Sequence, residues 1–133
     1  MTFIHELCGT PETLRTVQGL FDAVGKTAIV DEKRLSAGMM LASCGTAFAL
    51  RYVRASAEGG VELGLYPKEA LAAALQTVKG AAALLEARGS HPEAEIDRVT
   101  TPGGITIKGL NAMEEAGFSA AVIAGLKAWK PKA

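Results

Sequence analysis

The sequence predicts a mainly α fold, in which a short strand–helix–strand unit precedes an all-helical bundle. Three observations support this prediction. Strand-like and helical patterns alternate over the first thirty residues, no strand-like run follows residue 31, and 49% of the residues are hydrophobic although only 5% are aromatic. Helices built largely from glycine and alanine have thin cores, so we expect further burial against a second copy of the chain.

The strand–helix–strand pattern occupies residues 1–30. Residues 2–5 are strand-like, Thr10-Pro11-Glu12 combines an N-cap, a proline at the first helical position and an early acid, and residues 27–30 are strand-like again. Because two strands alone are marginally stable in water, this unit is typical of the edge of a larger sheet whose other strands lie outside the chain. Strands from a second subunit are the alternative source.

From Asp31 onward only helical patterns occur, and we place a second domain over residues 31–133. Each predicted helix begins at a capping residue or a proline, and most end at a glycine. The predicted helices start at Asp31, run from Thr46 to about Gly64, from Pro67 to Gly89, from Ser90 to about Val99 and from Thr101 to Gly117, and start again at Ser119, with the last ending in Lys127, Lys130 and Pro131.

Composition and charge exclude several classes of partner. The 14 basic and 14 acidic residues give no net charge, so no electrostatic argument favours nucleic acid or an anionic membrane. The longest uncharged run, residues 35–50, is shorter than the ~20 residues of a membrane span, and the N-terminus lacks a signal-peptide pattern. Two cysteines make no disulfide framework. We therefore expect a soluble, cytoplasmic protein without nucleic-acid or membrane partners.

Most of the familiar chemical motifs are missing from the sequence. Neither Gly-x-Gly-x-x-Gly nor a loop ending in Gly-Lys-Ser/Thr occurs, so we expect no cofactor-binding loop in this chain. His5 and Cys8 make a poor metal pair, so we expect no metal, and His91 falls in a capping sequence. Arg54 could bind an anion, but a solvated ion pair with Glu58 at helical spacing is the interpretation we favour.

The stretch from Thr100 to Ile107 has the pattern of an anion site at the start of a helix. Thr101 suits the N-cap and Pro102 the first helical position, which places Gly103 and Gly104 at the second and third. Two glycines there leave bare backbone N–H groups, which favour a carboxylate or a phosphate. The alternative is a simple helix start with a tight turn where another helix passes close, and this stretch alone does not separate the two.

Five segments have a distinctive order along the chain. They are Leu63-Gly-Leu, Gln76-Thr-Val-Lys-Gly-Ala-Ala, His91-Pro, Asp97-Arg-Val-Thr-Thr-Pro-Gly-Gly-Ile-Thr-Ile and Glu114-Glu-Ala-Gly-Phe118. Together they resemble the C-terminal half of pyrroline-5-carboxylate reductase, the last enzyme of proline biosynthesis. The Val-Thr-Thr-Pro-Gly-Gly-x-Thr motif is specific to that family, and the resemblance covers nearly the whole chain.

The resemblance implies an oxidoreductase that reduces 1-pyrroline-5-carboxylate to L-proline. In that family an N-terminal Rossmann-type domain binds NAD(P)H, and the C-terminal helices of two subunits interlock around the substrate. Residues 1–30 would then be the last strand–helix–strand of the nucleotide domain, and residues 31–133 the helical dimerisation and substrate-binding domain. The resemblance implies a homodimer, allows larger assemblies of dimers, and leaves no cofactor bound to this chain alone.

The resemblance also assigns roles to single residues. Thr101, Gly103 and Gly104, with Pro102 between them, would hold the substrate carboxylate, and Thr106 would hydrogen-bond the ring nitrogen and assist its protonation. Many family members have Ser-Gly-Ser-Gly-Pro where this chain has Ala42-Ser-Cys-Gly-Thr46, so a ligand contact in residues 42–46 is left open. We expect the chain alone to be inactive. A truncated, non-catalytic dimerisation module is the alternative.

Overall fold

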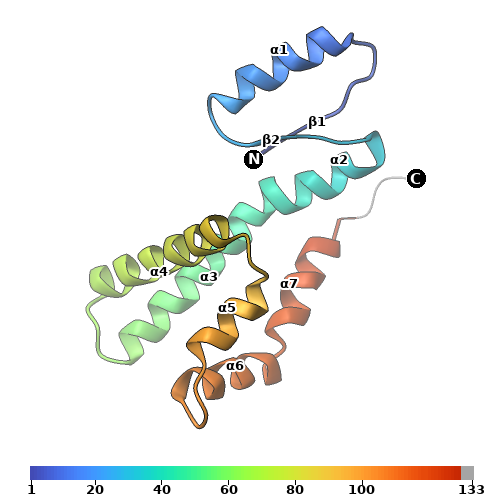
Figure 1. Ribbon diagram of the computed structural model, residues 1–133. Coiled ribbons are helices and arrows are strands. Elements are labelled where there is room, and N and C mark those ends of the chain that lie inside the picture. The colour runs from blue at the N-terminus through green and yellow to red at the C-terminus, as the bar shows by residue number, and fades with distance from the viewer. Residues whose placement is uncertain (130–133) are drawn as a thin grey trace. The chain divides into compact units, whose positions relative to one another are not determined.

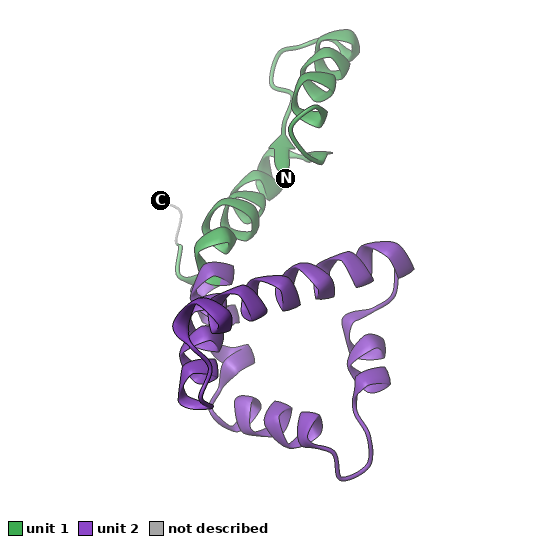
Figure 2. Cartoon of the chain, turned by 90° about the vertical axis from the view of Figure 1, so that its left-hand side faces the viewer, with its two compact units in different colours: residues 1–48, 126–133 green, residues 49–125 purple. Residues whose placement is uncertain are grey.

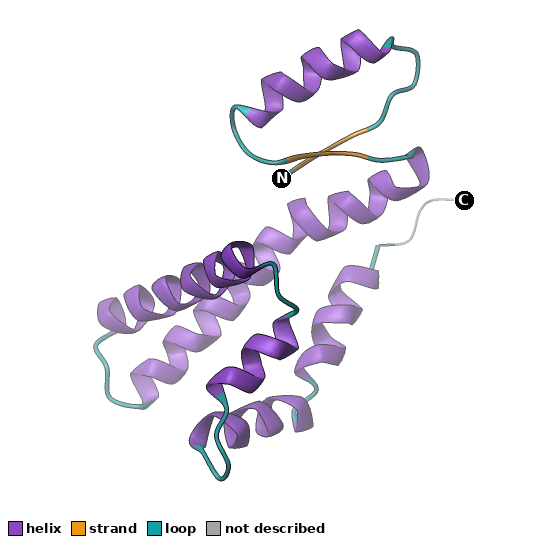
Figure 3. Cartoon of the chain, in the orientation of Figure 1, coloured by secondary structure: helices purple, strands orange, loops and turns teal. Residues whose placement is uncertain are grey.

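The computed structural model describes residues 1–129 as helices joined by short loops, with a two-stranded parallel sheet near the N-terminus (Figures 1 and 3). Residues 130–133, which include the predicted helix end at Lys130 and Pro131, lie outside the described residues. The elements are β1 (Thr2–Ile4), α1 (Pro11–Asp22), β2 (Thr27–Ile29), α2 (Glu32–Met39), the π-helical turn η1 (Met40–Cys44), α3 (Gly45–Glu62), α4 (Pro67–Arg88), α5 (Pro92–Val99), α6 (Ile105–Glu115) and α7 (Phe118–Lys127).

The chain divides into two compact units, which Figure 2 colours separately. The first contains residues 1–48 and the chain from Leu126 onward, and the second contains residues 49–125. The mainly helical fold with a small parallel sheet confirms the predicted fold class.

The first unit begins with the predicted strand–helix–strand. β1 and β2 pair in parallel, with Thr2 opposite Thr27, and α1 connects them. Thr10 caps α1 by accepting a hydrogen bond from the N–H of Thr13, and Pro11 follows at the first helical position. Local capping therefore explains where α1 starts. On β2, the hydroxyl oxygen of Thr27 is buried without a hydrogen-bond partner among the described residues.

The chain is already helical at residues 42–46, ahead of the helix start predicted at Thr46. A π-helical turn joins α2 to α3, and the N–H of Gly45 donates to the carbonyl of Met40, five residues back. The hydroxyl of Thr46 donates to the carbonyl of Ala42 at 2.9 Å. A proline at position 46 would lack an N–H and disturb the helix, whereas threonine lets the helix continue. The helix start predicted at Thr46 is therefore wrong, because α2, η1 and α3 follow one another without a break.

The second unit begins with the remainder of α3, followed by α4. Val53 and Ala57 of α3 and Ala70 of α4 are the buried hydrophobic residues of the described chain. A Cβ added at Gly60 would lie 3.0 Å from the Cβ of Ala70, so the two helices approach closely at small residues. Pro67 begins α4 and the left-handed Gly89 ends it, which confirms both predicted boundaries.

The described residues bury little apolar surface. No side chain of the described residues is completely buried, and many large apolar side chains are exposed. The predicted thin core is confirmed, and the helices need further burial that this chain does not supply.

Among residues 1–129, one helix, α4, is long and apolar enough to span a membrane by length and composition alone. It has 22 residues with a mean hydropathy of 1.2 over its most apolar stretch, and 6% of that stretch is buried within the chain. The expectation based on the uncharged run 35–50 overlooked this helix, because a few charged residues interrupt its alanine-rich sequence. Core helices of water-soluble proteins have the same composition, so this feature does not identify a membrane protein.

We predict that Gly38→Ala destabilises the chain by about 1–3 kcal/mol through overpacking. A Cβ at Gly38 would lie 2.6 Å from the ring of Phe3 on β1, so the ring would have to move. Gly19→Ala in α1 is the matched control: nothing lies within 4 Å of its added Cβ, and we expect a gain of about 0.5–1 kcal/mol. Chemical denaturation measures the free energy of unfolding of both variants. Equal changes in the two would contradict the close contact between Gly38 and Phe3.

Candidate functional site

The segment Thr101–Gly104 forms a tight turn in front of α6. The N–H of Gly104 donates to the carbonyl of Thr101 at 2.9 Å, and Gly103 has a φ of +72°. Proline followed by glycine suits the two central positions of a type II turn. Helix α6 therefore begins at Ile105 with Gly104 as its N-cap, three residues beyond the predicted N-cap at Thr101. The predicted helical positions of Pro102, Gly103 and Gly104 are wrong because the turn accounts for these residues.

The later helix start changes which N–H groups are available to an anion. The N–H of Gly104 is already used by Thr101, so it is not the free donor that the sequence suggested. No side chain caps α6, because its N-cap is a glycine. The N–H groups of Ile105, Thr106 and Ile107 have no helical partner four residues back. The donors at this helix start therefore belong to residues 105–107.

The candidate site is open in a single chain. Thr101, Pro102, Gly103 and Thr106 are exposed and Gly104 is half-buried. Ile105 is 87% exposed although it is apolar. The structure thus brings the predicted residues together in one turn and helix start, with nothing from the described chain covering them.

Gly104 also has a steric reason to be glycine. A Cβ at this position would lie 2.5 Å from the hydroxyl oxygen of Thr101 and 3.0 Å from its carbonyl oxygen. Gly103 has open space around it, but its positive φ disfavours any residue with a side chain. The Gly-Gly pair is therefore required by the turn itself, with or without a ligand.

A buried carboxylate lies one helix upstream of this turn. Glu95 of α5 is 7% exposed, and its oxygens accept hydrogen bonds from Arg88 at 2.7 Å, Ser90 at 2.5 Å and Arg98 at 2.5 Å. The Ser90 hydroxyl contributes most to lowering the pKa of Glu95 below its usual value of 4.5; burial opposes this shift, and the two arginines add to it. We call these four residues the Glu95 cluster.

Sequence reasoning missed this cluster because it assigned Ser90 to a capping box. The N-cap of α5 is His91, whose ring nitrogen accepts from the N–H of Glu93 at 3.3 Å. The cap predicted at Ser90 is therefore wrong by one residue, because the Ser90 hydroxyl donates to Glu95 instead. The spacing of Glu95 and Arg98 on one helix face was a visible signal. Arg88 lies on the other side of Gly89, at the end of α4, so the sequence gave no signal of its contact with Glu95.

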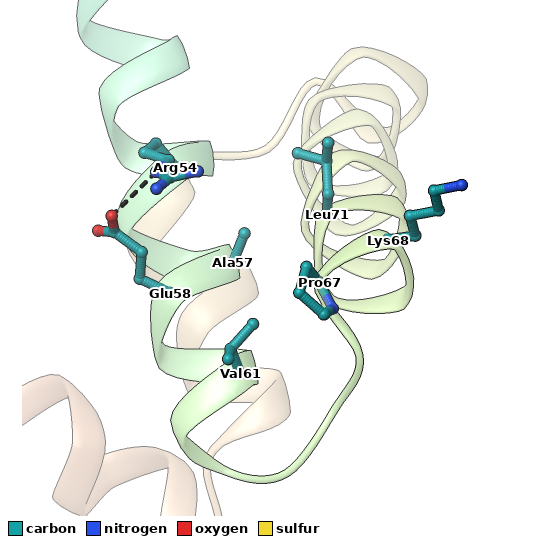
Figure 4. Close-up of a pocket in the computed structure, with 7 residues that line it drawn as sticks. All are labelled: Arg54, Ala57, Glu58, Val61, Pro67, Lys68 and Leu71. Carbon is teal, nitrogen blue, oxygen red and sulfur yellow. Dashed lines mark hydrogen bonds and ion pairs between the residues drawn. The ribbon is translucent and has the colours of Figure 1, made fainter.

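A groove lies between α3 and α4, with a volume of about 450 Å³. Figure 4 shows Arg54 and Glu58 on α3 beside this groove, joined by a hydrogen bond, with Leu71 facing them from α4. Nε of Arg54 lies 2.9 Å from Oε1 of Glu58, and both side chains are more than half exposed. The favoured interpretation of Arg54, a solvated ion pair, is confirmed.

Comparison with known protein families identifies the chain. The model of the pyrroline-5-carboxylate reductase dimerisation domain matches residues 32–133. The chain belongs to the pyrroline-5-carboxylate reductase family. This finding confirms the resemblance drawn from the Val99–Thr106 motif.

Curated members of the pyrroline-5-carboxylate reductase family are longer than this chain. Pyrroline-5-carboxylate reductase 2 of Dictyostelium discoideum is 45% identical over 113 residues, which are 85% of this chain and 38% of that protein. The reductase of Arabidopsis thaliana is 42% identical over 89% of this chain and 44% of its own length. The chain thus spans less than half the length of these relatives.

Solved structures of family members share the fold. The reductase of Streptococcus pyogenes is 30% identical with a TM-score of 0.86, covering 92% of this chain and 47% of that one. The Plasmodium falciparum structure, which has NADP bound, is 22% identical with a TM-score of 0.87, covering 95% of this chain and 49% of that one. At this lower identity the second likeness concerns the fold alone.

We predict that the Glu95 carboxylate makes folding depend on acidity. Because its pKa is lower in the folded chain, its contribution is present above the usual value of 4.5 and is lost as pH falls through the folded value. Urea unfolding of the wild type and Glu95→Gln at pH 7 and pH 3.5 measures this. The stability difference between them should shrink at pH 3.5, whereas the exposed Glu93→Gln control should show little difference at either pH.

Proposed function

We propose that this chain supplies the dimer interface and the substrate-carboxylate site of an enzyme that reduces 1-pyrroline-5-carboxylate to L-proline with NAD(P)H. The observation that carries this proposal is the uncapped start of α6 behind the Thr101–Gly104 turn, in a chain of the reductase family. The substrate has one carboxylate beside a ring C=N group, which sets the two tasks of the site.

The first task is to hold the carboxylate. The N–H groups of Ile105, Thr106 and Ile107 point out of the start of α6 and can donate to it. Each hydrogen bond to a charged group contributes about 1.5–3 kcal/mol, whereas the helix dipole adds about 0.3–1 kcal/mol at an exposed site. The hydrogen bonds therefore dominate, with the exposed Thr101 hydroxyl as a further donor.

The second task concerns the ring nitrogen, which gains a proton when the C=N bond is reduced. Thr106 lies at the second position of α6, so its hydroxyl is close to the N–H groups that hold the carboxylate. A threonine hydroxyl is too weak an acid to give up its proton, so Thr106 acts by hydrogen-bonding the nitrogen and fixing the ring, and the proton comes from water, which reaches this exposed site. Bound NAD(P)H would supply the hydride to the ring carbon.

The residues of this chain do not fit a dinucleotide. Its strand–helix turn lacks the glycine fingerprint, and the Thr10 hydroxyl already takes the N–H of Thr13 at the start of α1. We therefore propose that NAD(P)H is bound by residues outside this chain, and that the chain alone is inactive. Residues 1–30 would be the edge of that nucleotide domain. The chain covers 38% and 44% of two curated relatives, which leaves room for such a domain in proteins of that length.

The exposed apolar side chains support a homodimer, and larger assemblies of dimers are compatible with them. Apolar side chains of α3 and α4, such as Val61, Leu71 and Leu75, are exposed in the single chain, and a second copy would cover them. This arrangement also suits a cytoplasmic enzyme that binds a small imino acid and neither nucleic acid nor membrane. The family model, a dimerisation domain, supports the same proposal.

A second candidate function is a non-catalytic dimerisation module. One observation favours it: the steric contact between Gly104 and Thr101 explains the glycine without any ligand. The two candidates share the fold and the dimer, so they differ only in whether a carboxylate binds at residues 105–107.

We predict that the chain is a dimer in detergent-free buffer, with about twice the 13.8 kDa of one copy. Sedimentation equilibrium at micromolar concentration measures this mass. Association buries apolar helix faces, so the dimer should persist at high salt. A monomer, or a chain that stays in solution only with detergent or lipid vesicles, would contradict the proposed partner and favour a membrane role for α4.

We predict that Ile105→Pro weakens L-proline binding to the chain about 10- to 100-fold, because it removes one N–H donor to a carboxylate. Proline is well tolerated at the first helical position, and the extended backbone of Gly104 suits a residue before proline. Ile105→Ala is the control: it removes the side chain, keeps the N–H and should bind within about twofold.

NMR titration with L-proline distinguishes the two candidates. Shifts concentrated at the N–H signals of residues 105–107 support the carboxylate site. No binding by the wild type would favour the non-catalytic module. Equal affinity of Ile105→Pro and the wild type would remove the N–H of residue 105 from the site.

A further inference from the structure

Glu95 is the buried charged residue of the described chain, and the proposed chemistry does not use it. Its Oε2 accepts from Arg88 at the end of α4, and its Oε1 accepts from Ser90 in the linker and from Arg98 in α5. The two arginine side chains are about half exposed, with 49% of Arg88 and 58% of Arg98 accessible. The Glu95 cluster therefore ties three consecutive parts of the chain to one carboxylate.

Helix α5 depends on this cluster for its attachment to the end of α4. It has eight residues, and an isolated helix of that length is unstable in water. No apolar residue of α5 is buried: Ile96 is half-buried, and Val99 is 61% exposed. Glu95 is its single buried residue. Within this chain, ionic hydrogen bonds fix α5 where an apolar contact usually would.

The end of α5 leads directly into the carboxylate site. The N–H and the hydroxyl of Thr100 both donate to the carbonyl of Asp97, at 3.4 and 3.1 Å. The next residue, Thr101, begins the turn whose last residue caps α6. No flexible linker separates α5 from the turn, so the direction of α5 sets where the N–H groups of residues 105–107 point.

We propose that Glu95 is a positioning residue for the carboxylate site: by fixing α5 to the end of α4, it aims the Thr101–Gly104 turn and the start of α6. This inference rests on the proposed function for its ligand. Glu95 itself does not contact the substrate, so its loss weakens binding without removing a donor. Removing one partner of a buried ion pair leaves the other groups uncompensated, which releases α5 locally.

The test compares Glu95→Gln with Glu93→Gln in the full 133-residue chain. The two changes are chemically identical and lie on the same helix, but Glu93 is exposed. Arg98→Met is a second variant, which keeps the apolar stem and removes one donor to Glu95. The two readouts are L-proline affinity by NMR titration and amide hydrogen exchange, compared between residues 92–107 and helix α4.

We expect Glu95→Gln to weaken L-proline binding about 2- to 30-fold, the range for substitutions that act on a site without touching the ligand. Exchange should accelerate over residues 92–107 while α4 stays protected. Arg98→Met should show the same pattern more weakly, and Glu93→Gln should match the wild type.

Two results would overturn the inference: exchange and affinity in Glu95→Gln that match Glu93→Gln, or accelerated exchange spread equally over α4, which indicates general destabilisation. Failure of the wild type to bind L-proline would instead count against the proposed function. The exchange comparison would then decide by itself whether Glu95 fixes α5 and the turn.

Discussion

A shortage of buried apolar surface governs this structure. The buried hydrophobic residues of the described chain are Val53, Ala57 and Ala70, which are small or medium in size. Burial contributes about 25 cal/mol per Å² of apolar area, and many other large apolar side chains stay partly exposed, so burial within the chain offsets the cost of ordering it only weakly. The helices must therefore be completed from outside, and this requirement agrees with a family defined by its dimerisation domain.

The same shortage explains why polar contacts determine local geometry. Where no apolar core fixes a segment, its position depends on caps, turns and ion pairs. Thr10 determines the start of α1, the carbonyl of Thr101 closes the turn before α6, and the Glu95 cluster holds α5. These contacts are short in sequence separation, so each forms without waiting for the rest of the fold. The cluster differs in joining groups from two helices.

The sequence predicted element types well and some helix starts poorly, for one physical reason. Pro11, Pro67 and Gly89 act through their own backbone geometry, so their effects can be inferred without knowing their neighbours. Hydroxyl residues choose among several partners. Ser90 was assigned to a cap but bonds Glu95, and Ser119 was assigned to a cap but lies within α7, where its hydroxyl donates to Glu114. Which partner such a residue takes depends on the folded arrangement.

The candidate site shows the same limit at the level of the backbone. The motif indicates where the proposed site lies, but the Thr101 carbonyl takes the N–H of Gly104, and the N–H groups without a helical partner at the start of α6 are those of residues 105–107. Every residue except proline has the same backbone N–H group. The sequence can therefore indicate where such a site can lie, but it does not indicate which N–H groups are free. Gly103 is informative because its positive φ permits the turn from Thr101 to Gly104. That turn leaves α6 without a side-chain cap, and an uncapped helix start is what a carboxylate can complete.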